Sequence, residues 1–144
     1  MVEIDSFESD LTASKKIAKG SSVITLVFTA IDLQVMPTGP PKEVKIGGST
    51  TGVTLISNVA VPGQQGWQRQ YTYTYTVASS PGENARIGYA IKIADTIGNE
   101  RSVIAGAEDI IEIGMSTFAS QDTQQPFIDA AWVNLRVGLI LSVI

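Results

Sequence analysis

The sequence contains no cysteine and no histidine. Without cysteine there is no disulfide framework, no thiolate nucleophile and no cysteine-ligated zinc. Without histidine the chain lacks the side chain that titrates nearest neutral pH, and Ser-His-Asp and Cys-His catalysis are excluded. We therefore expect a protein that is not an enzyme and that uses no metal and no cofactor.

Basic residues and long apolar runs are also scarce. Ten Lys+Arg stand against 14 Asp+Glu, a formal net charge of −4, which is the wrong sign for a phosphate-binding surface. The apolar stretch 133–144 is too short for a membrane-spanning helix. Residues 1–11 carry acids where a signal peptide needs a basic start, so an export sequence was removed or the protein assembles inside a cell. We expect neither a nucleic-acid partner nor a membrane span.

Short runs that alternate between apolar and polar residues dominate the sequence. Clusters of Gly, Pro, Ser and Asn separate them, the pattern of half-buried strands in a sandwich. The clearest run is 67–77, in which every residue from 71 to 77 is β-branched or aromatic. The best helix candidate, 118–131, contains Pro126, so it predicts a turn or two at most. The pattern predicts an all-β sandwich, with strands over 23–33, 43–46, 52–61, 67–77 and 86–94.

Four motifs, taken in order, resemble the bacterial immunoglobulin-like repeats of surface adhesins and extracellular multi-domain proteins. They are KGSSVITLVFTA (19–30), VKIGG (44–48), YTYTYTV (71–77) and the DTIGN turn (95–99). The resemblance covers roughly residues 10–105. It implies an immunoglobulin-like Greek-key sandwich of seven strands, an extracellular or particle-surface setting and no catalytic residues. We expect that sandwich over 1–105 and a β-rich C-terminal extension over 106–144.

Aromatic side chains are the first candidate binding groups. Tyr71, Tyr73 and Tyr75 share one face of their strand, which predicts core packing rather than a sugar-binding platform. Trp67 lies beside the glycine-containing loop 63–66 and is the better candidate to bind a glycan.

Carboxylates are the second candidate group. Asp95, with Gly98 and Asn99, could offer oxygens to calcium, but a tight hairpin turn explains the same residues. Glu108, Asp109 and Glu112 are close in sequence, and nothing marks them as a buried catalytic pair. Lys92 falls in the outward phase of its strand, which predicts a solvated side chain.

The C-terminal segment carries the strongest remaining signal. Six apolar residues share one phase of an alternating run, and such a strand must bury one face. It joins its own sandwich, forms a small sheet with residues 109–115, or adds to the sheet of a neighbouring subunit. The residues of this predicted assembly strand are Val133, Leu135, Val137, Leu139, Leu141 and Val143.

The function that the sequence favours is a non-catalytic structural or adhesive surface protein. It would self-associate, or anchor to a neighbouring surface or virion subunit, through its sheet edges and C-terminal strand. A phage virion protein (a capsid decoration or tail component) is the first alternative, and a carbohydrate-binding module that uses Trp67 is the second. The expected location is extracellular or on the cell surface, with the virion as the alternative.

Overall fold

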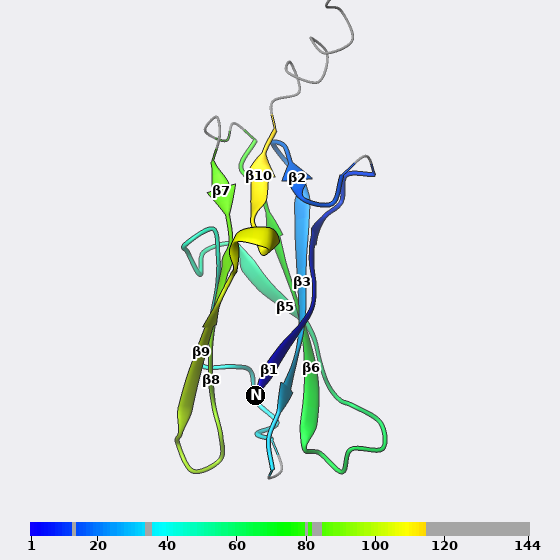
Figure 1. The fold of residues 1–144 in the computed structure, drawn as a ribbon, viewed down its shortest axis with the longest axis vertical. Coiled ribbons are helices and arrows are strands. Elements are labelled where there is room, and N and C mark those ends of the chain that lie inside the picture. Colours follow the sequence, from blue (N-terminus) through cyan, green and yellow to red (C-terminus); the bar gives the residue numbers. More distant parts are fainter. Residues whose placement is uncertain (13, 34–35, 80, 82–84, 115–144) are drawn as a thin grey trace, which may run out of the picture. The chain divides into compact units, whose positions relative to one another are not determined.

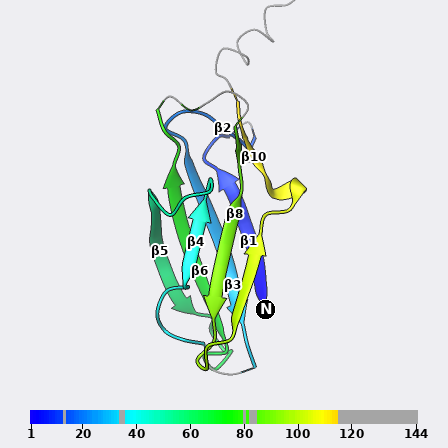
Figure 2. The same ribbon diagram turned by 90° about the vertical axis from the view of Figure 1, so that its left-hand side faces the viewer.

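The computed structural model describes residues 1–12, 14–33, 36–79, 81 and 85–114. The chain divides into two units, Met1–Ile113 and Gly114–Ile144. The first unit is built from two layers of β-strands, as Figures 1 and 2 show. The predicted all-β sandwich is therefore confirmed. The helix candidate 118–131 and the six apolar residues of the predicted assembly strand lie outside the described residues.

One layer is a four-stranded antiparallel sheet with the order β1-β3-β6-β5. The central strands β3 and β6 pair over nine residues without a break in register. The outer strands β1 and β5 each contain a register shift, between Ile4 and Ser6 and between Leu55 and Ser57. The strands of this sheet are β1 (Val2–Ser9), β3 (Val23–Ile31), β5 (Val53–Ala60) and β6 (Gln68–Thr76).

The other layer consists of two three-stranded sheets, with the orders β4-β8-β9 and β2-β10-β7. Only Gly88 separates β7 from β8, and the short 3-10 helix η1 (Ala107–Asp109) lies between β9 and β10. All pairs are antiparallel except the pair of β2 and β10, which is parallel. The strands are β2 (Ile17–Ala18), β4 (Glu43–Ile46), β7 (Arg86–Ile87), β8 (Tyr89–Ala94), β9 (Glu100–Ile104) and β10 (Ile111–Ile113).

The strand order can be compared with that of an immunoglobulin-like domain. If the two-residue strand β2 is left out, and β7 with β8 and β9 with β10 each count as one strand, the four-stranded sheet contains strands one, two, five and four. Strands three, six and seven then form the other layer. This order is compatible with a constant-type immunoglobulin sandwich. The immunoglobulin-like Greek-key assignment itself remains a prediction.

The core lies where the predicted alternation places it. Ile24, Leu26 and Phe28 of β3 are fully buried. Across the two layers, Phe7 of β1 meets Tyr89 of β8 edge to face, with ring centroids 5.0 Å apart. The remaining buried apolar side chains alternate with more exposed ones along their strands and include Tyr71, Tyr73, Ile87, Ile91, Ile93, Val44 and Ile46.

Four strands lie outside the predicted strand ranges, the longer β1 and β9 and the short β2 and β10. In β1 the register shift at Asp5 moves the inward phase from Val2 and Ile4 to Phe7 and Ser9. A bulge of this kind breaks strict alternation. β9 is a mostly polar edge strand. Because β10 pairs with β2 and β7, the first unit continues past the predicted boundary at residue 105 to Ile113.

Candidate functional site

Trp67, the predicted glycan contact, lies immediately before β6 at one end of the sandwich. Its side chain is 45% exposed. Its backbone is held on both sides, because its N–H donates to Gln64 O (2.9 Å) and its carbonyl accepts from the Asp32 N–H (3.0 Å). The residue after Asp32, Leu33, is 87% exposed. The structure thus presents an accessible indole on a fixed backbone, close in the fold to a second exposed apolar side chain.

The tyrosine stripe of β6 belongs to the core, as the sequence predicts. Tyr71 and Tyr73 are buried, and Phe28 stacks on Tyr71 with ring centroids 5.2 Å apart. Burial raises the pKa of Tyr73 to about 12, because the charged phenolate is poorly solvated there. Burial also raises the pKa of Tyr71, although the nearby Arg69 opposes this shift. These rings are therefore not available as a sugar platform.

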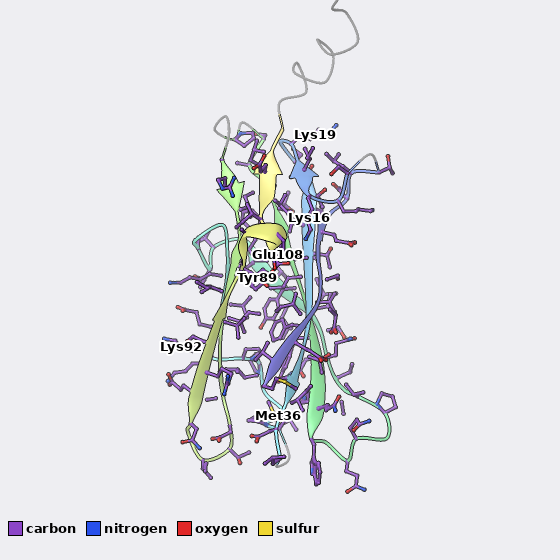
Figure 3. All side chains as sticks on the ribbon, viewed as in Figure 1. Lys16, Lys19, Met36, Tyr89, Lys92 and Glu108 are labelled. Atoms are coloured by element: carbon purple, nitrogen blue, oxygen red, sulfur yellow. The ribbon has the colours of Figure 1, made fainter. Side chains whose placement is uncertain are left out.

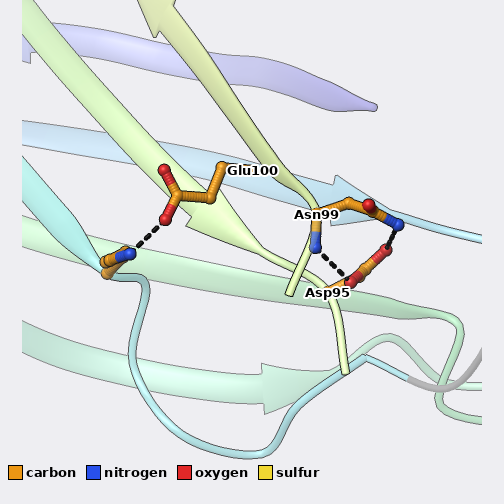
Figure 4. Close-up of polar contacts among 4 residues, drawn as sticks. Asp95, Asn99 and Glu100 are labelled. Carbon is orange, nitrogen blue, oxygen red and sulfur yellow. Dashed lines mark hydrogen bonds and ion pairs between the residues drawn. The ribbon is translucent and has the colours of Figure 1, made fainter. Parts of the chain in front are cut away.

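Asp95 shapes the hairpin between β8 and β9 (Figure 4). Its Oδ1 accepts from the backbone N–H groups of Ile97 (2.9 Å) and Asn99 (2.8 Å), and its Oδ2 accepts from Asn99 Nδ2 (2.8 Å). The hydrogen bond from the Asn99 side chain is the main reason why the pKa of Asp95 lies below its ordinary value. Gly98 has φ +96°, the left-handed region that glycine tolerates best.

The geometry of this turn fits the hairpin interpretation rather than a calcium loop. The carboxylate of Asp95 is already used by three donors of the turn. In the part of the chain that the structure describes, no group of three or more Asp, Glu, His or Cys side chains is placed to hold a metal ion.

A half-open cavity of about 200 Å³ lies beside this turn. Four separate segments line it, namely the N-terminus, the end of β3, the loop at Met36 and the β8–β9 hairpin. Glu100 at its wall pairs with Lys42, and the hydrogen bond from that ammonium lowers the pKa of the Glu100 carboxyl. No local sequence signal could have revealed this cavity, because its walls come from segments far apart in the chain.

The C-terminal acids have separate partners. Asp109 of η1 accepts from the Tyr89 hydroxyl (3.0 Å), while Glu112 pairs with Arg86 across β10 and β7 (2.7 Å). Burial, then the hydrogen bond to Asp109, raises the pKa of Tyr89. Figure 3 shows Tyr89 and Glu108 near η1, and Lys92 on the outer side of β8 as predicted. The structure gives Asp109 and Glu112 the roles of a hydroxyl acceptor and a surface ion pair.

The edge strands of the four-stranded sheet and of the β4-β8-β9 sheet differ sharply in charge. β1 carries Glu3, Asp5 and Glu8, β4 carries Glu43 and Lys45, and β9 carries Glu100 and Arg101. The fourth edge strand, β5, has the sequence VTLISNVA and no charged residue. Charged side chains are one of the ways in which proteins keep sheet edges from pairing with other chains. β5 therefore lacks a protection that the other three edges have.

The β5 edge also exposes apolar side chains. Leu55 is 37% exposed, Ile56 60% and Val59 50%. The alternation over 52–61 predicts this strand but does not mark it as an edge. Its composition gives no such signal, because an uncharged β-branched run is equally typical of an inner strand.

Comparison of the chain with family models, curated proteins and solved structures finds no match. The resemblance to bacterial immunoglobulin-like repeats thus remains a prediction from the four motifs. Among the described residues, there is no helix with the length and apolar character needed to cross a membrane.

Proposed function

We propose that this protein is a non-catalytic structural or adhesive protein that self-associates, or anchors to a partner subunit, through its sheet edges and its C-terminal segment. The observation that carries the proposal is the β5 edge, which is uncharged and exposes Leu55, Ile56 and Val59. An exposed apolar sheet edge is a template for pairing with another strand. The proposed setting is a cell surface, with a virion as the alternative.

The non-catalytic part of the proposal is supported by the chemistry of the side chains. The chain has no cysteine and no histidine. Two of the three acids that the sequence singles out are bound to neighbours of the fold, Asp109 to Tyr89 and Glu112 to Arg86. General acid-base work by a carboxylate pair needs two acids that converge on one substrate position.

Sedimentation of the full chain tests the proposal. We expect the sedimentation coefficient to rise with protein concentration. A variant with Leu135→Glu, Leu139→Glu and Leu141→Glu places charges on the apolar phase of the C-terminal segment and should remain monomeric.

The matched control changes the opposite phase of the same segment, with Asn134→Glu, Arg136→Glu and Ser142→Glu. It adds the same side chain at three positions and should still associate. A wild-type protein that is monomeric at every concentration contradicts the proposal, as does equal association of both variants.

Carbohydrate binding is the second candidate function, and the exposure of Trp67 favours it. An indole that is 45% exposed on a backbone held by Gln64 and Asp32 can stack on a sugar ring. Glycan-array binding that Trp67→Ala abolishes, and that Ile97→Ala leaves unchanged, would support this function. Ile97 is a suitable control because it is 71% exposed in a different loop.

A further inference from the structure

We infer that β5 is the acceptor edge for the C-terminal segment 133–144 of a second copy of this chain, which pairs with it as an added strand. The inference rests on the proposed self-association and assigns the surface through which it occurs. The occupant is a segment of the chain itself, so each copy carries one acceptor edge and one donor strand.

The choice of β5 follows from comparison with the other edges. β1, β4 and β9 would place Glu3, Glu43 or Glu100 beside an incoming strand. The incoming segment, VNLRVGLILSVI, contains a single charged residue, Arg136. An apolar strand loses least solvation of charged groups when its neighbour is also uncharged. β5 is uncharged over eight residues, whereas the uncharged edge strand β2 has only two.

Both ends of β5 expose side chains, and the end that carries the fewest side-chain hydrogen bonds is the N-terminal half. Towards the C-terminal end, Arg69 donates to both the side chain and the backbone carbonyl of Asn58 (2.9 and 3.2 Å). That interaction already covers part of the edge. The side chain with the greatest apolar exposure, Ile56 at 60%, lies before Asn58 at the register shift. We therefore place the first contacts of the added strand at Val53–Ile56.

The end of the described chain lies at the same end of the sandwich as this half of β5. Val53 pairs with Tyr75, and Ile111 of β10 pairs with Ile87. A Cβ atom at Gly47 would lie 3.7 Å from the Tyr75 hydroxyl and 3.8 Å from Ile87 Cγ2, so Gly47 links the two pairs. From Gly114 to Val133 an extended chain spans up to about 60 Å, which is long enough to reach a neighbouring molecule.

This pairing is heterologous, because the donor strand and the acceptor edge are different surfaces. A heterologous contact forms a ring if its rotation closes and a filament if it does not. The expected products are therefore closed rings, the smallest of which is a dimer that exchanges strands reciprocally, or linear chains.

Cysteine cross-linking in the full chain tests the pairing, and the absence of native cysteine makes each introduced thiol unique. Protein with Ile56→Cys is mixed with isotope-labelled protein carrying Leu139→Cys, and a short bis-maleimide is added. We expect a cross-linked dimer of one labelled and one unlabelled chain. The matched control replaces Ile56→Cys by Ile104→Cys, a residue 74% exposed on the charged edge β9. The control yield should be far lower, because β9 is not the proposed acceptor edge.

A second pair of variants measures association directly. Ile56→Lys should weaken self-association about tenfold or more, because it places a charge on the acceptor edge. Ile104→Lys should leave association unchanged. Both side chains are mostly exposed, so circular dichroism and urea unfolding are expected to match the wild type.

The outcomes separate this inference from the proposed function. A wild-type chain that does not associate overturns both. If the wild type associates but Ile56→Lys has no effect, or Ile104→Cys cross-links as well as Ile56→Cys, the β5 assignment is overturned and self-association stands. If the double variant Ile56→Cys, Leu139→Cys cross-links only within single chains, the segment belongs to its own edge and the inference is overturned.

Discussion

The two outer strands of the four-stranded sheet, β1 and β5, differ in how well their free edges are protected from pairing with another chain. Each contains a β-bulge, at Asp5 in β1 and at Ile56 in β5. In β1 the bulged side chain is an acid that accepts hydrogen bonds from Thr29 Oγ1 (2.8 Å) and Gln70 Nε2 (3.2 Å). In β5 the bulged side chain is an exposed isoleucine.

A β-bulge alone does not decide whether a sheet edge is protected from pairing with another chain. β1 combines its bulge with three acids and with a buried anchor, Phe7, which contacts Tyr89 of the opposite layer. β5 has neither charge nor a fully buried side chain. The first edge is thus protected and fixed to the core, whereas the second is available for pairing.

The largest expected effect is on the free energy of unfolding, and it compares one apolar side chain from each strand, Phe7 of β1 and Leu55 of β5. Phe7→Ala removes a side chain that is 2% exposed and should lower the free energy of unfolding by about 3–5 kcal/mol. Leu55→Ala, at a side chain 37% exposed, should cost about 1 kcal/mol or less. Urea unfolding at neutral pH measures both. Equal losses would break the comparison, since β5 would then be as firmly packed as β1.

A smaller effect concerns the acid at the β1 bulge. Asp5→Ala removes the acceptor of the bonds from Thr29 and Gln70 and should destabilise by about 1 kcal/mol. The control is Glu3→Ala on the same exposed side of β1, which should change stability by less than about 0.5 kcal/mol. If the two variants unfold at the same urea concentration, the acid at the bulge has no special role in β1.

The titration of Tyr73 at alkaline pH tests how well β5 shields this ring of the neighbouring strand β6 from solvent. Burial raises the pKa of Tyr73 from 10.0 to about 12, so folding favours the neutral phenol. That contribution to stability is complete below pH 10 or so and is lost as the pH rises towards 12. Leu55 lies opposite Tyr73 in the sheet, so Leu55→Ala should lower the pKa of Tyr73. Ultraviolet titration of tyrosinate measures the shift, with Leu33→Ala as a control distant from Tyr73 in the sheet register. An unchanged titration would show that β5 does not shield this ring.

The smallest effect concerns the hairpin that leads into β9, a charged edge of the other layer. Asn99→Ala removes the main cause of the low pKa of Asp95, which should rise towards its ordinary value. A depressed pKa contributes stability above the ordinary value of the group, and this is lost as the pH falls. The variant should therefore lose less stability in acid than the wild type. Nuclear magnetic resonance titration of Asp95 measures the pKa, and Thr96→Ala in the same turn should leave it unchanged.

The alternation of the residues by itself determined which side chains face the core. Ile24, Leu26, Phe28, Tyr71 and Tyr73 stand at alternate positions of two predicted strands and are buried, because successive side chains of a strand point to opposite faces. The same alternation could not identify β1, since the bulge at Asp5 moves its apolar residues from one phase to the other.

Only the tertiary structure decided which strands are edges. β5 and β6 are both uncharged over most of their length and both are rich in β-branched or aromatic residues, yet β6 lies between two strands and β5 has a free side. Strand order depends on pairing between residues far apart in the chain, such as Val2 with Ala30 and Ile113 with Ala18. The local sequence predicts which residues of a strand share a face, but it does not predict which strands lie beside it. The free edge of β5 could therefore be identified only from the folded sheet.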